Sequence, residues 1–287
     1  MAFHFLDGSW DLRAQRVFIM GILNVTPDSF SDGGQFASLD RAIEHAERLA
    51  REGADAVDIG GESTRPGSDP VSATEEMNRV LPVIRELRQK IHIPLSIDTT
   101  KADVAAGAIE CGASIVNDVT AGCGDREMLR VVAGTGAGII LMHMKGTPRA
   151  LQADPQYEDV VGDIRAFLDA RVTAAVSAGI GRDHIAIDPG IGFGKTLQHN
   201  LLLLRNLSAI ASLGMPVVIG TSRKAFIGRI TGQDLPEARI DGTIASSLYA
   251  VAQGAHILRV HDVAAVKRAL DVWLAIERSV DGAEVRS

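Results

Sequence analysis

The stretch IPLSIDTTKADVAAGAIECGASIVNDV, residues 93–119, joins two kinds of local pattern. Its two ends, 93–98 and 114–119, are short, apolar and β-prone, which is typical of strands. The middle, 101–111, is predicted as a helix. Parallel strands need a helical crossover of this kind, so the stretch predicts one strand–helix–strand unit.

The same unit recurs along the chain, about eight times in roughly 265 residues, which is the arithmetic of a TIM barrel. We therefore predict an α/β fold, a (β/α)8 barrel. A doubly wound sheet is the alternative, although its usual order needs fewer units and no closure. The predicted strands are 17–24, 56–62, 93–98, 114–119, 138–143, 184–190, 216–222 and 255–262. The predicted helices are 38–53, 72–90, 101–111, one from about 125, 157–179, 197–214, 237–253 and 263–278.

The segment FHFLDGSWDLR, residues 3–13, precedes the first barrel strand. Its apolar arms flank Asp7 and Gly8, a pair typical of tight hairpin turns. We predict a β-hairpin that caps the bottom of the barrel. No linker or low-complexity tract interrupts the chain, so residues 1–287 are predicted to form one domain.

Composition narrows the class of protein. Hydrophobic residues make up 46% of the 287 residues and aromatic residues only 4%, so Ala, Val, Ile and Leu must build the core. The net charge of -7 and the absence of a basic stripe argue against a nucleic-acid partner. No signal peptide and no apolar run of about 18 residues is visible, so we expect a cytoplasmic protein without a membrane span.

The active site of a TIM barrel lies at the carboxyl ends of its strands. Because side chains alternate along a strand, Ser96 and Asp98 share one face, as do Arg259 and His261. We expect the apolar faces to meet the helices and the ionisable faces to meet at the barrel mouth. The side chains at the eight strand ends are Asn24, Glu62, Asp98, Asn117 with Asp118, His143, Asp188, Ser222 with Lys224, and Arg259 with His261.

Structural roles compete with functional ones at these positions. A lone Asp at a strand end is often a helix N-cap. His143 fits either a barrel wall or a site, and Asp118, which has the opposite parity to Asn117, fits a loop anchor. A convergent set from at least six strands is harder to explain in this way, because charges are almost never buried unpaired.

The stretch PGIGFGKT, residues 189–196, resembles two nucleotide-binding motifs and matches neither. A P-loop requires glycine at 189, where this chain has Pro189, and GIGFG is one residue short of the dinucleotide fingerprint. We predict instead that these glycines let the backbone approach a flat ligand, with Phe193 as an apolar wall.

The two halves of the mouth suit different chemistry. Arg259 and His261, with Ser222 and Lys224, lie where barrels bind phosphate, and Asn24 with the acidic loop after it offers oxygen ligands to Mg²⁺. The other half carries Asp98, Asn117 and Asp188. These side chains suit an uncharged heterocycle rich in N–H donors, because a carboxylate accepts two parallel N–H bonds well.

Nine stretches along the chain match one family in order. They are ILNVTPDSFSDGG, DIGGESTRPG, LSIDT, ASIVNDV, LMHMKGTPR, IDPGIGFGK, GTSRKAFIG, DGTIASS and LRVHDV. The first two, together with TSRK, are the most specific. Through these stretches the chain resembles the dihydropteroate synthase family of pterin-binding barrels over about residues 16–262. The resemblance implies a homodimeric transferase of folate biosynthesis and a sulfonamide target. It would join 6-hydroxymethyl-7,8-dihydropterin diphosphate to 4-aminobenzoate by a dissociative substitution, with Mg²⁺ as cofactor.

The resemblance also implies a role for each matching residue. The pterin contacts are Asp98, Asn117, Met142, Asp188 and Lys224. The aminobenzoate contacts are Thr64, Arg65, Pro66, Phe193 and Ser222. The diphosphate contacts are Asn24, Thr64, Arg259 and His261, with Asn24 also as metal ligand. The catalytic residues are Asp32, Arg65, Asp98 and Lys224. Asp32 and Arg65 would lie on loops that close over the substrates, and the loop NVTPDSFSDGG, residues 24–34, is predicted to be such a lid, hinged at Gly33 and Gly34.

Three alternatives stay open. A pterin-dependent corrinoid methyltransferase would share the Asp and Asn set but has no use for the NVTPDSFSDGG and STRPG loops. An aldolase would form a Schiff base on Lys224. A catalytically inactive pterin-binding or scaffolding barrel would bind the same ligand without turnover.

Overall fold

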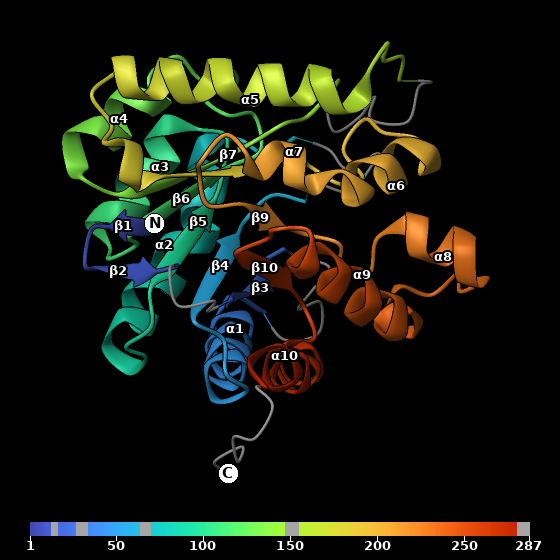
Figure 1. Ribbon diagram of the computed structural model, residues 1–287. Coiled ribbons are helices and arrows are strands. Elements are labelled where there is room, and N and C mark those ends of the chain that lie inside the picture. Colours follow the sequence, from blue (N-terminus) through green and yellow to red (C-terminus); the bar gives the residue numbers. More distant parts are fainter. Residues whose placement is uncertain (13–16, 27–33, 64–69, 147–154, 280–287) are drawn as a thin grey trace.

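The computed structural model describes residues 1–12, 17–26, 34–63, 70–146 and 155–279, and its centre is a barrel of parallel strands ringed by helices (Figure 1). The strands are β1 (Ala2–Phe5), β2 (Gly8–Asp11), β3 (Phe18–Asn24), β4 (Ala56–Gly60), β5 (Leu95–Asp98), β6 (Ile115–Asp118), β7 (Gly138–Met142), β8 (Ile185–Asp188), β9 (Val218–Ile219) and β10 (Ile257–Val260). The α-helices are α1 (Gly34–Arg51), α2 (Ala73–Lys90), α3 (Ala102–Glu110), α4 (Met128–Thr135), α5 (Val160–Ser177), α6 (Leu197–Arg205), α7 (Leu207–Ala211), α8 (Ala225–Thr231), α9 (Ile240–Ala252) and α10 (Val263–Arg278). Short 3₁₀ turns lie at Arg182–His184 and Pro236–Arg239.

Strand pairing confirms the predicted barrel. The eight barrel strands follow the order β8-β7-β6-β5-β4-β3-β10-β9, and every ladder between them is parallel. A parallel bridge between Ile187 and Val217 joins the two ends of that order and closes the ring. Closure places all eight carboxyl ends at one mouth, which a doubly wound sheet would not do.

The helices follow the predictions with two differences. The predicted helix 197–214 is two helices, because Asn206 leaves helical geometry and its side-chain amide donates to the carbonyl of Leu202. Helix α8 was missed, since its seven residues are too few for a periodic pattern. The predicted capping of α2 is present, where the Ser72 hydroxyl accepts from the backbone N–H of Glu75.

The predicted N-terminal hairpin is present and seals the lower end of the barrel. β1 and β2 pair antiparallel with Phe5 opposite Gly8, so the loop is Leu6–Asp7, one residue earlier than predicted. The ring of Trp10 stacks on Phe18 of the first barrel strand at 4.6 Å between centroids. Gly138 of β7 lies directly against the ring of Phe3, so the hairpin closes the barrel from below.

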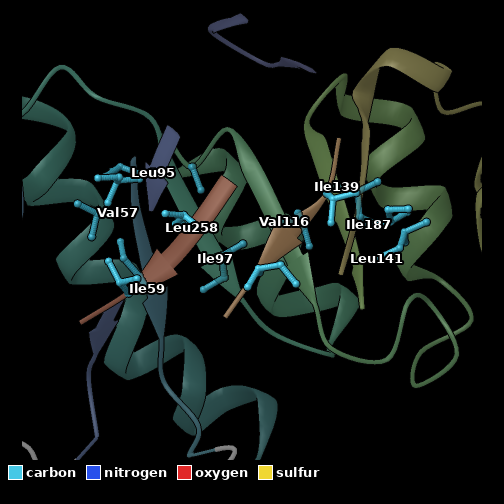
Figure 2. Packing of buried hydrophobic residues seen from close by; sticks show 14 of the residues in the cluster. Val57, Ile59, Leu95, Ile97, Val116, Ile139, Leu141, Ile187 and Leu258 are labelled. Carbon is cyan, nitrogen blue, oxygen red and sulfur yellow. The ribbon is translucent and has the colours of Figure 1, made fainter. Parts of the chain in front are cut away.

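Each barrel strand has an outward and an inward face, as the alternation predicts. Outward side chains such as Ile59, Ile97 and Leu258 pack against the helices in the main core (Figure 2). Inward side chains in the lower half of the barrel form a second core with the hairpin. Its members are Phe3, Phe5, Trp10, Leu12, Phe18, Met20, Ala56, Ile115, Ile140, Ala186, Val218 and Ile257. In the part of the chain described above, no helix is long and apolar enough to cross a membrane.

Candidate active site

The inward positions above the lower core carry polar side chains that converge on the mouth. Asp58 follows Ala56 by two residues, and Asn117, Asp188 and Arg259 stand two residues after inward apolar positions on their own strands. Because alternate residues share a face, each of these side chains projects into the barrel above the apolar plug. The structure therefore brings the two predicted halves of the site together inside one ring.

Arg259 is the centre of this cluster. Its Nε donates to Asp58 Oδ2 at 2.6 Å, and one terminal nitrogen donates to Asp98 Oδ2 at 2.7 Å. The same Asp58 oxygen accepts from the side-chain amide of Asn117 at 3.0 Å. Burial alone would lower the pKa of Arg259, but the carboxylates of Asp58 and Asp98 raise it above its ordinary value. The mouth therefore holds one permanent cation between two carboxylates.

Of the two carboxyls predicted to face the heterocycle, Asp188 is buried and Asp98 is half-buried. Burial raises the pKa of Asp98 to about 7, and the nearby charges of Asp58, Glu76 and Asp118 act in the same direction, against Arg259. Burial raises the pKa of Asp188 to about 6, opposed by the hydrogen bond that Asp188 Oδ1 accepts from Gly190 N–H at 2.6 Å. Both groups thus titrate near neutral pH, where an N–H-rich ligand would favour their charged forms.

Lys224 and Phe193 form a wall beside these carboxyls. The Lys224 ammonium lies 4.0 Å from the centre of the Phe193 ring, a cation–π contact. Burial lowers the pKa of Lys224 to about 8, with the charge of Arg259 acting in the same direction. Met142 and Val119 pack with Phe193 in a small apolar cluster of their own, so an apolar surface adjoins the polar one.

Lys195 holds the loops after β7 and β8 together. Its buried ammonium lies 3.0 Å from His143 Nδ1 and donates to the carbonyls of His143 and Phe193 at 3.3 and 3.0 Å. Gly190 and Gly194 permit this approach, because a Cβ there would lie 2.0 and 2.1 Å from carbonyl oxygens of the neighbouring loop. These two glycines therefore permit close contact between the two loops.

His143 is a satisfied histidine of the barrel wall. Its ring meets that of Phe167 edge-on at 4.9 Å, and burial lowers its pKa to about 3, so it stays neutral. Asp118 is a loop anchor, as its parity indicated. It accepts hydrogen bonds from the backbone N–H groups of Thr120 and Gly122 and from the Thr120 hydroxyl.

Ser222 and His261 are in direct contact. The Ser222 hydroxyl accepts from the His261 backbone N–H at 3.1 Å and lies 3.0 Å from His261 Nδ1. The Ser222 hydroxyl can donate its hydrogen to Nδ1, in which case the ring proton lies on Nε2. Burial lowers the pKa of His261 to about 3, helped by the charges of Arg223 and Arg259, so His261 is a neutral N–H donor and not a cation.

Arg223 holds the segment between these residues in place. It is one of two non-glycine residues in the described part of the chain with a positive φ, at 58°. Its guanidinium forms a paired contact with Asp262 at 2.9 and 2.5 Å, and its backbone N–H donates to Thr243. The resulting turn places Ser222 and Lys224, the residues on either side, at the mouth.

Asn24 lies at the end of β3, half-buried. Its side-chain oxygen and Asp98 Oδ2 lie on either side of Gly60, at 3.9 and 3.7 Å from where a Cβ of Gly60 would be. Among the described residues, no group of three or more His, Cys, Asp or Glu is arranged to hold a metal ion. One amide oxygen fits Mg²⁺ that takes its other ligands from water and substrate phosphates.

Four predicted site residues, Asp32, Thr64, Arg65 and Pro66, lie outside the described residues, as does most of the predicted lid. Gly34, its second predicted hinge, is the first residue of α1. Glu62, taken as the inward residue of the second barrel strand, lies beyond the strand end and pairs with Lys101, which also contacts the buried Glu76.

The sequence reasoning missed Asp58 and Lys195. Asp58 has the same parity as Gly60, the last residue of its strand, so the alternation that identified Asp98 and Asp188 would also have identified it. The observed strand ends at Gly60, two residues before the predicted end at Glu62. Lys195 has no such signal, because its partner His143 comes from another strand end.

Comparisons with known proteins agree on the family. The profile of the pterin binding enzyme family matches residues 20–261. The dihydropteroate synthase of Synechocystis is 47% identical over 264 residues, which cover 92% of this chain and 91% of that protein. The enzyme of Escherichia coli is 41% identical over 266 residues, 93% of each chain.

Solved structures extend this agreement to the fold. The dihydropteroate synthase of Xanthomonas albilineans in complex with 7,8-dihydropteroate superposes with a TM-score of 0.89 and 43% identity, over 98% of this chain and 100% of that one. A structure of the Xanthomonas enzyme with 4-aminobenzoic acid gives a TM-score of 0.88 and 47% identity, over 92% and 94% of the two chains. The chain therefore belongs to the pterin-binding enzyme family and, within it, to the dihydropteroate synthases.

Proposed function

We propose that this chain joins 6-hydroxymethyl-7,8-dihydropterin diphosphate to 4-aminobenzoate and releases 7,8-dihydropteroate and diphosphate. The observation that carries the proposal is the convergence of three acceptor side chains, Asp98, Asn117 and Asp188, beside two half-buried cations, Lys224 and Arg259, at one barrel mouth. A pterin presents adjacent N–H donors, and a diphosphate presents negative oxygens. The acceptor side chains therefore match the pterin end of this substrate, and the two cations match its diphosphate end.

At the pterin end, Asp188 is the anchor. Its carboxylate accepts from the 2-amino group and the neighbouring ring N–H, while Asn117 and Lys224 offer donors to the ring acceptors. Asp98 lies beside Arg259, from which it accepts a hydrogen bond. As the bond to the leaving oxygen lengthens, positive charge develops on the pterin methylene and spreads over the ring. A preorganised carboxylate such as Asp98 stabilises that charge.

At the diphosphate end, Arg259 supplies positive charge and His261 supplies a neutral Nε2–H. Binding of an anion favours the protonated form of His261 and raises its pKa, so some of the charge compensation arises only with substrate present. Bound Mg²⁺ would neutralise part of the charge that develops on the departing diphosphate, with Asn24 as its protein ligand.

At the aminobenzoate end, Phe193 and Ser222 border the mouth next to Lys224. The predicted contacts Thr64, Arg65 and Pro66 would complete this pocket. The carbon–oxygen bond to diphosphate breaks first, the neutral aryl amine then bonds to the methylene carbon, and the amine releases one proton to water. No covalent enzyme intermediate is required, so Lys224 acts as a positioning cation.

Turnover with purified substrates tests the function directly. We expect stoichiometric 7,8-dihydropteroate and diphosphate from the two substrates, measured by chromatography and a diphosphate assay. Pterin binding without turnover would support the inactive scaffold instead. Methyl transfer to cobalamin, or a borohydride-trapped adduct on Lys224, would support the methyltransferase or the aldolase.

Removal of metal tests the proposed Mg²⁺. We expect EDTA to abolish turnover and added Mg²⁺ to restore it, because the ion would offset negative charge that develops on the departing diphosphate. An Asn24→Asp variant should shift the Mg²⁺ concentration needed for half-maximal rate downward, since a carboxylate binds the ion more tightly. Full turnover in metal-free buffer would remove the role of Asn24.

We further propose a homodimer and a cytoplasmic location. Helices α9 and α10 expose Tyr249, Val272 and Ile276, with 47%, 64% and 64% of their surfaces accessible, and such large apolar residues favour burial against a second copy. Val272→Asp together with Ile276→Asp should halve the mass measured by light scattering. An unchanged mass would remove this interface. Cell fractionation tests the location.

A further inference from the structure

One buried carboxylate connects the two ends of the proposed substrate site. Asp58 is fully buried in β4, and its Oδ2 accepts from both Asn117 Nδ2 and Arg259 Nε, at 3.0 and 2.6 Å. In the barrel order, β6 and β10 each lie two strands away from β4, on opposite sides. A single oxygen atom thus links side chains that enter the mouth from two different directions.

The two side chains that Asp58 links serve different parts of the proposed substrate. Asn117 belongs to the half that suits the heterocycle, and Arg259 belongs to the half that suits the diphosphate. Arg259 keeps 19% of its side chain exposed and Asp98 keeps 11%, whereas Asp58 has none. A substrate in the mouth can reach Arg259 and Asp98, and Asp58 acts on it only through them and Asn117.

We propose that Asp58 is a positioning residue that sets the register between Asn117 and Arg259, and thereby holds the pterin ring and the diphosphate at the separation that the bond-breaking methylene carbon requires. This inference rests on the proposed function. Arginine and asparagine side chains have several rotamers, and a shared charged acceptor selects one combination of them. Displacement by about 1 Å at a reacting centre costs on the order of 100-fold in rate.

The proposal predicts a difference between whole substrate and fragments. A free pterin alcohol or inorganic diphosphate can adjust to a displaced subsite, because nothing ties it to the other end. The intact pterin diphosphate must fit both subsites at once, so it loses the advantage of linkage when their register changes. A general loss of structure would instead weaken all three ligands together.

Two variants separate geometry from charge. Asp58→Asn keeps the shape and removes the charge, while Asp58→Glu keeps the charge and moves the carboxylate by one methylene. In both variants we expect kcat to fall by about 30-fold or more. Calorimetry in the presence of Mg²⁺ should show weaker binding of pterin diphosphate to both variants. The dissociation constants of the two fragments, 6-hydroxymethylpterin and inorganic diphosphate, should stay within about threefold of wild type, because only the advantage of linkage is lost. Asp169→Asn and Asp169→Glu, on the exposed face of α5, are matched controls that should leave all values unchanged.

The pH dependence of kcat/KM separates an effect of Asp58 on the site from a purely structural effect, because a structural residue would not shift it. The charged groups that act on Asp98 include Arg259, Asp58, Glu76 and Asp118, and Asp98 also interacts with Lys224. The charge of Asp58 raises the pKa of Asp98. Asp58→Asn should therefore shift the acid limb of kcat/KM to lower pH, while Asp58→Glu should leave it near its wild-type position.

Three outcomes would overturn the proposal. Asp58→Glu with wild-type kcat would show that charge alone matters. Affinities for the intact substrate and both fragments that fall by the same factor would show that Asp58 has only a structural role. Unfolding of both variants would show the same. If wild type itself forms no product, the proposed function fails first, so the two failures are distinguishable.

Discussion

The two ends of the barrel interior are built on the same strands and have opposite chemistry. Near the hairpin, the inward positions are apolar, with Ala186 and Ile257 as examples. Two residues further along the same strands, the inward positions are Asp188 and Arg259. Most of the side-chain surface at both ends is shielded from water, yet one end is a hydrophobic core and the other is a set of ionisable groups.

This difference separates stability from chemistry along one axis. Burial of apolar surface at the lower end contributes to folding at about 25 cal/mol per Å². Burial of Asp98, Asp188 and Lys224 at the upper end opposes folding, as their shifted pKa values indicate. The lower end should therefore respond to substitution with changes in stability, and the upper end with changes in binding.

The largest effect should come from placing a carboxylate, the type of group found at the mouth, among the apolar side chains of the lower end. In an Ala186→Asp variant, a carboxylate would stand one inward position below Asp188, among the apolar side chains of the plug. An unpaired buried charge at this place should lower the free energy of unfolding by more than about 4 kcal/mol and leave little folded protein. Circular dichroism and expression yield measure this. Ala170→Asp, on the exposed face of α5, is the matched control. A stable Ala186→Asp variant would contradict the division between the two ends.

A loss of apolar packing at the lower end should come next. Trp10 stacks on Phe18 and meets Phe5 edge-on at 5.4 Å, so Trp10→Ala should lower the free energy of unfolding by about 3–5 kcal/mol. Chemical denaturation gives the value. Pterin affinity of the fraction that remains folded should be unchanged, because the mouth lies at the other end. A selective loss of pterin affinity would show that the two ends are coupled.

An isosteric change at the upper end should affect binding and spare the fold. Asp188→Asn can still accept from Gly190 N–H, but it presents an N–H donor to the N–H groups of the pterin. The loss of a charge-assisted hydrogen bond, together with the donors left unpaired, should weaken the free energy of pterin binding by about 2–4 kcal/mol. That corresponds to binding of pterin diphosphate weaker by about 30- to 1,000-fold. Wild-type affinity would reduce Asp188 to a structural cap, and an unfolded variant would place it in the scaffold.

The smallest effect should be on the pH dependence of stability, because Asp188→Asn removes the group that titrates. Because the folded-state pKa of Asp188 is raised to about 6 from an ordinary 3.8, the folded state binds more protons than the unfolded state between these values. The contribution of Asp188 to stability is therefore greatest below about pH 4 and is lost as the pH rises through about 6, at most about 3 kcal/mol. Asp188→Asn should match wild type in melting temperature near pH 4 and exceed it by a few degrees above pH 6. A constant difference at all pH values would contradict the raised pKa.

The sequence by itself determined the class of fold and the composition of the mouth. Strand–helix alternation implied eight parallel strands, and two-residue parity separated Asp98 from Ile97 and Asn117 from Asp118. These properties are local, because the period of a strand and the length of a crossover depend on neighbouring residues alone. The same two-residue parity also predicts that Asp58 faces the barrel interior. The predicted end of β4 lay two residues too far along the chain, so Glu62 and not Asp58 was predicted as the site residue of this strand.

Only the tertiary structure decided which of these side chains contact one another. Asp58 and Arg259 are 201 positions apart and meet because the barrel closes through β3. Lys195 meets His143 because two strand-end loops approach at glycines. Burial, and with it the raised pKa of Asp188 and the lowered pKa of His261, also depends on closure, since water is excluded only once all eight strands are in place. Local pattern specifies the residue types, whereas their pairing and protonation follow from the ring that the whole chain completes.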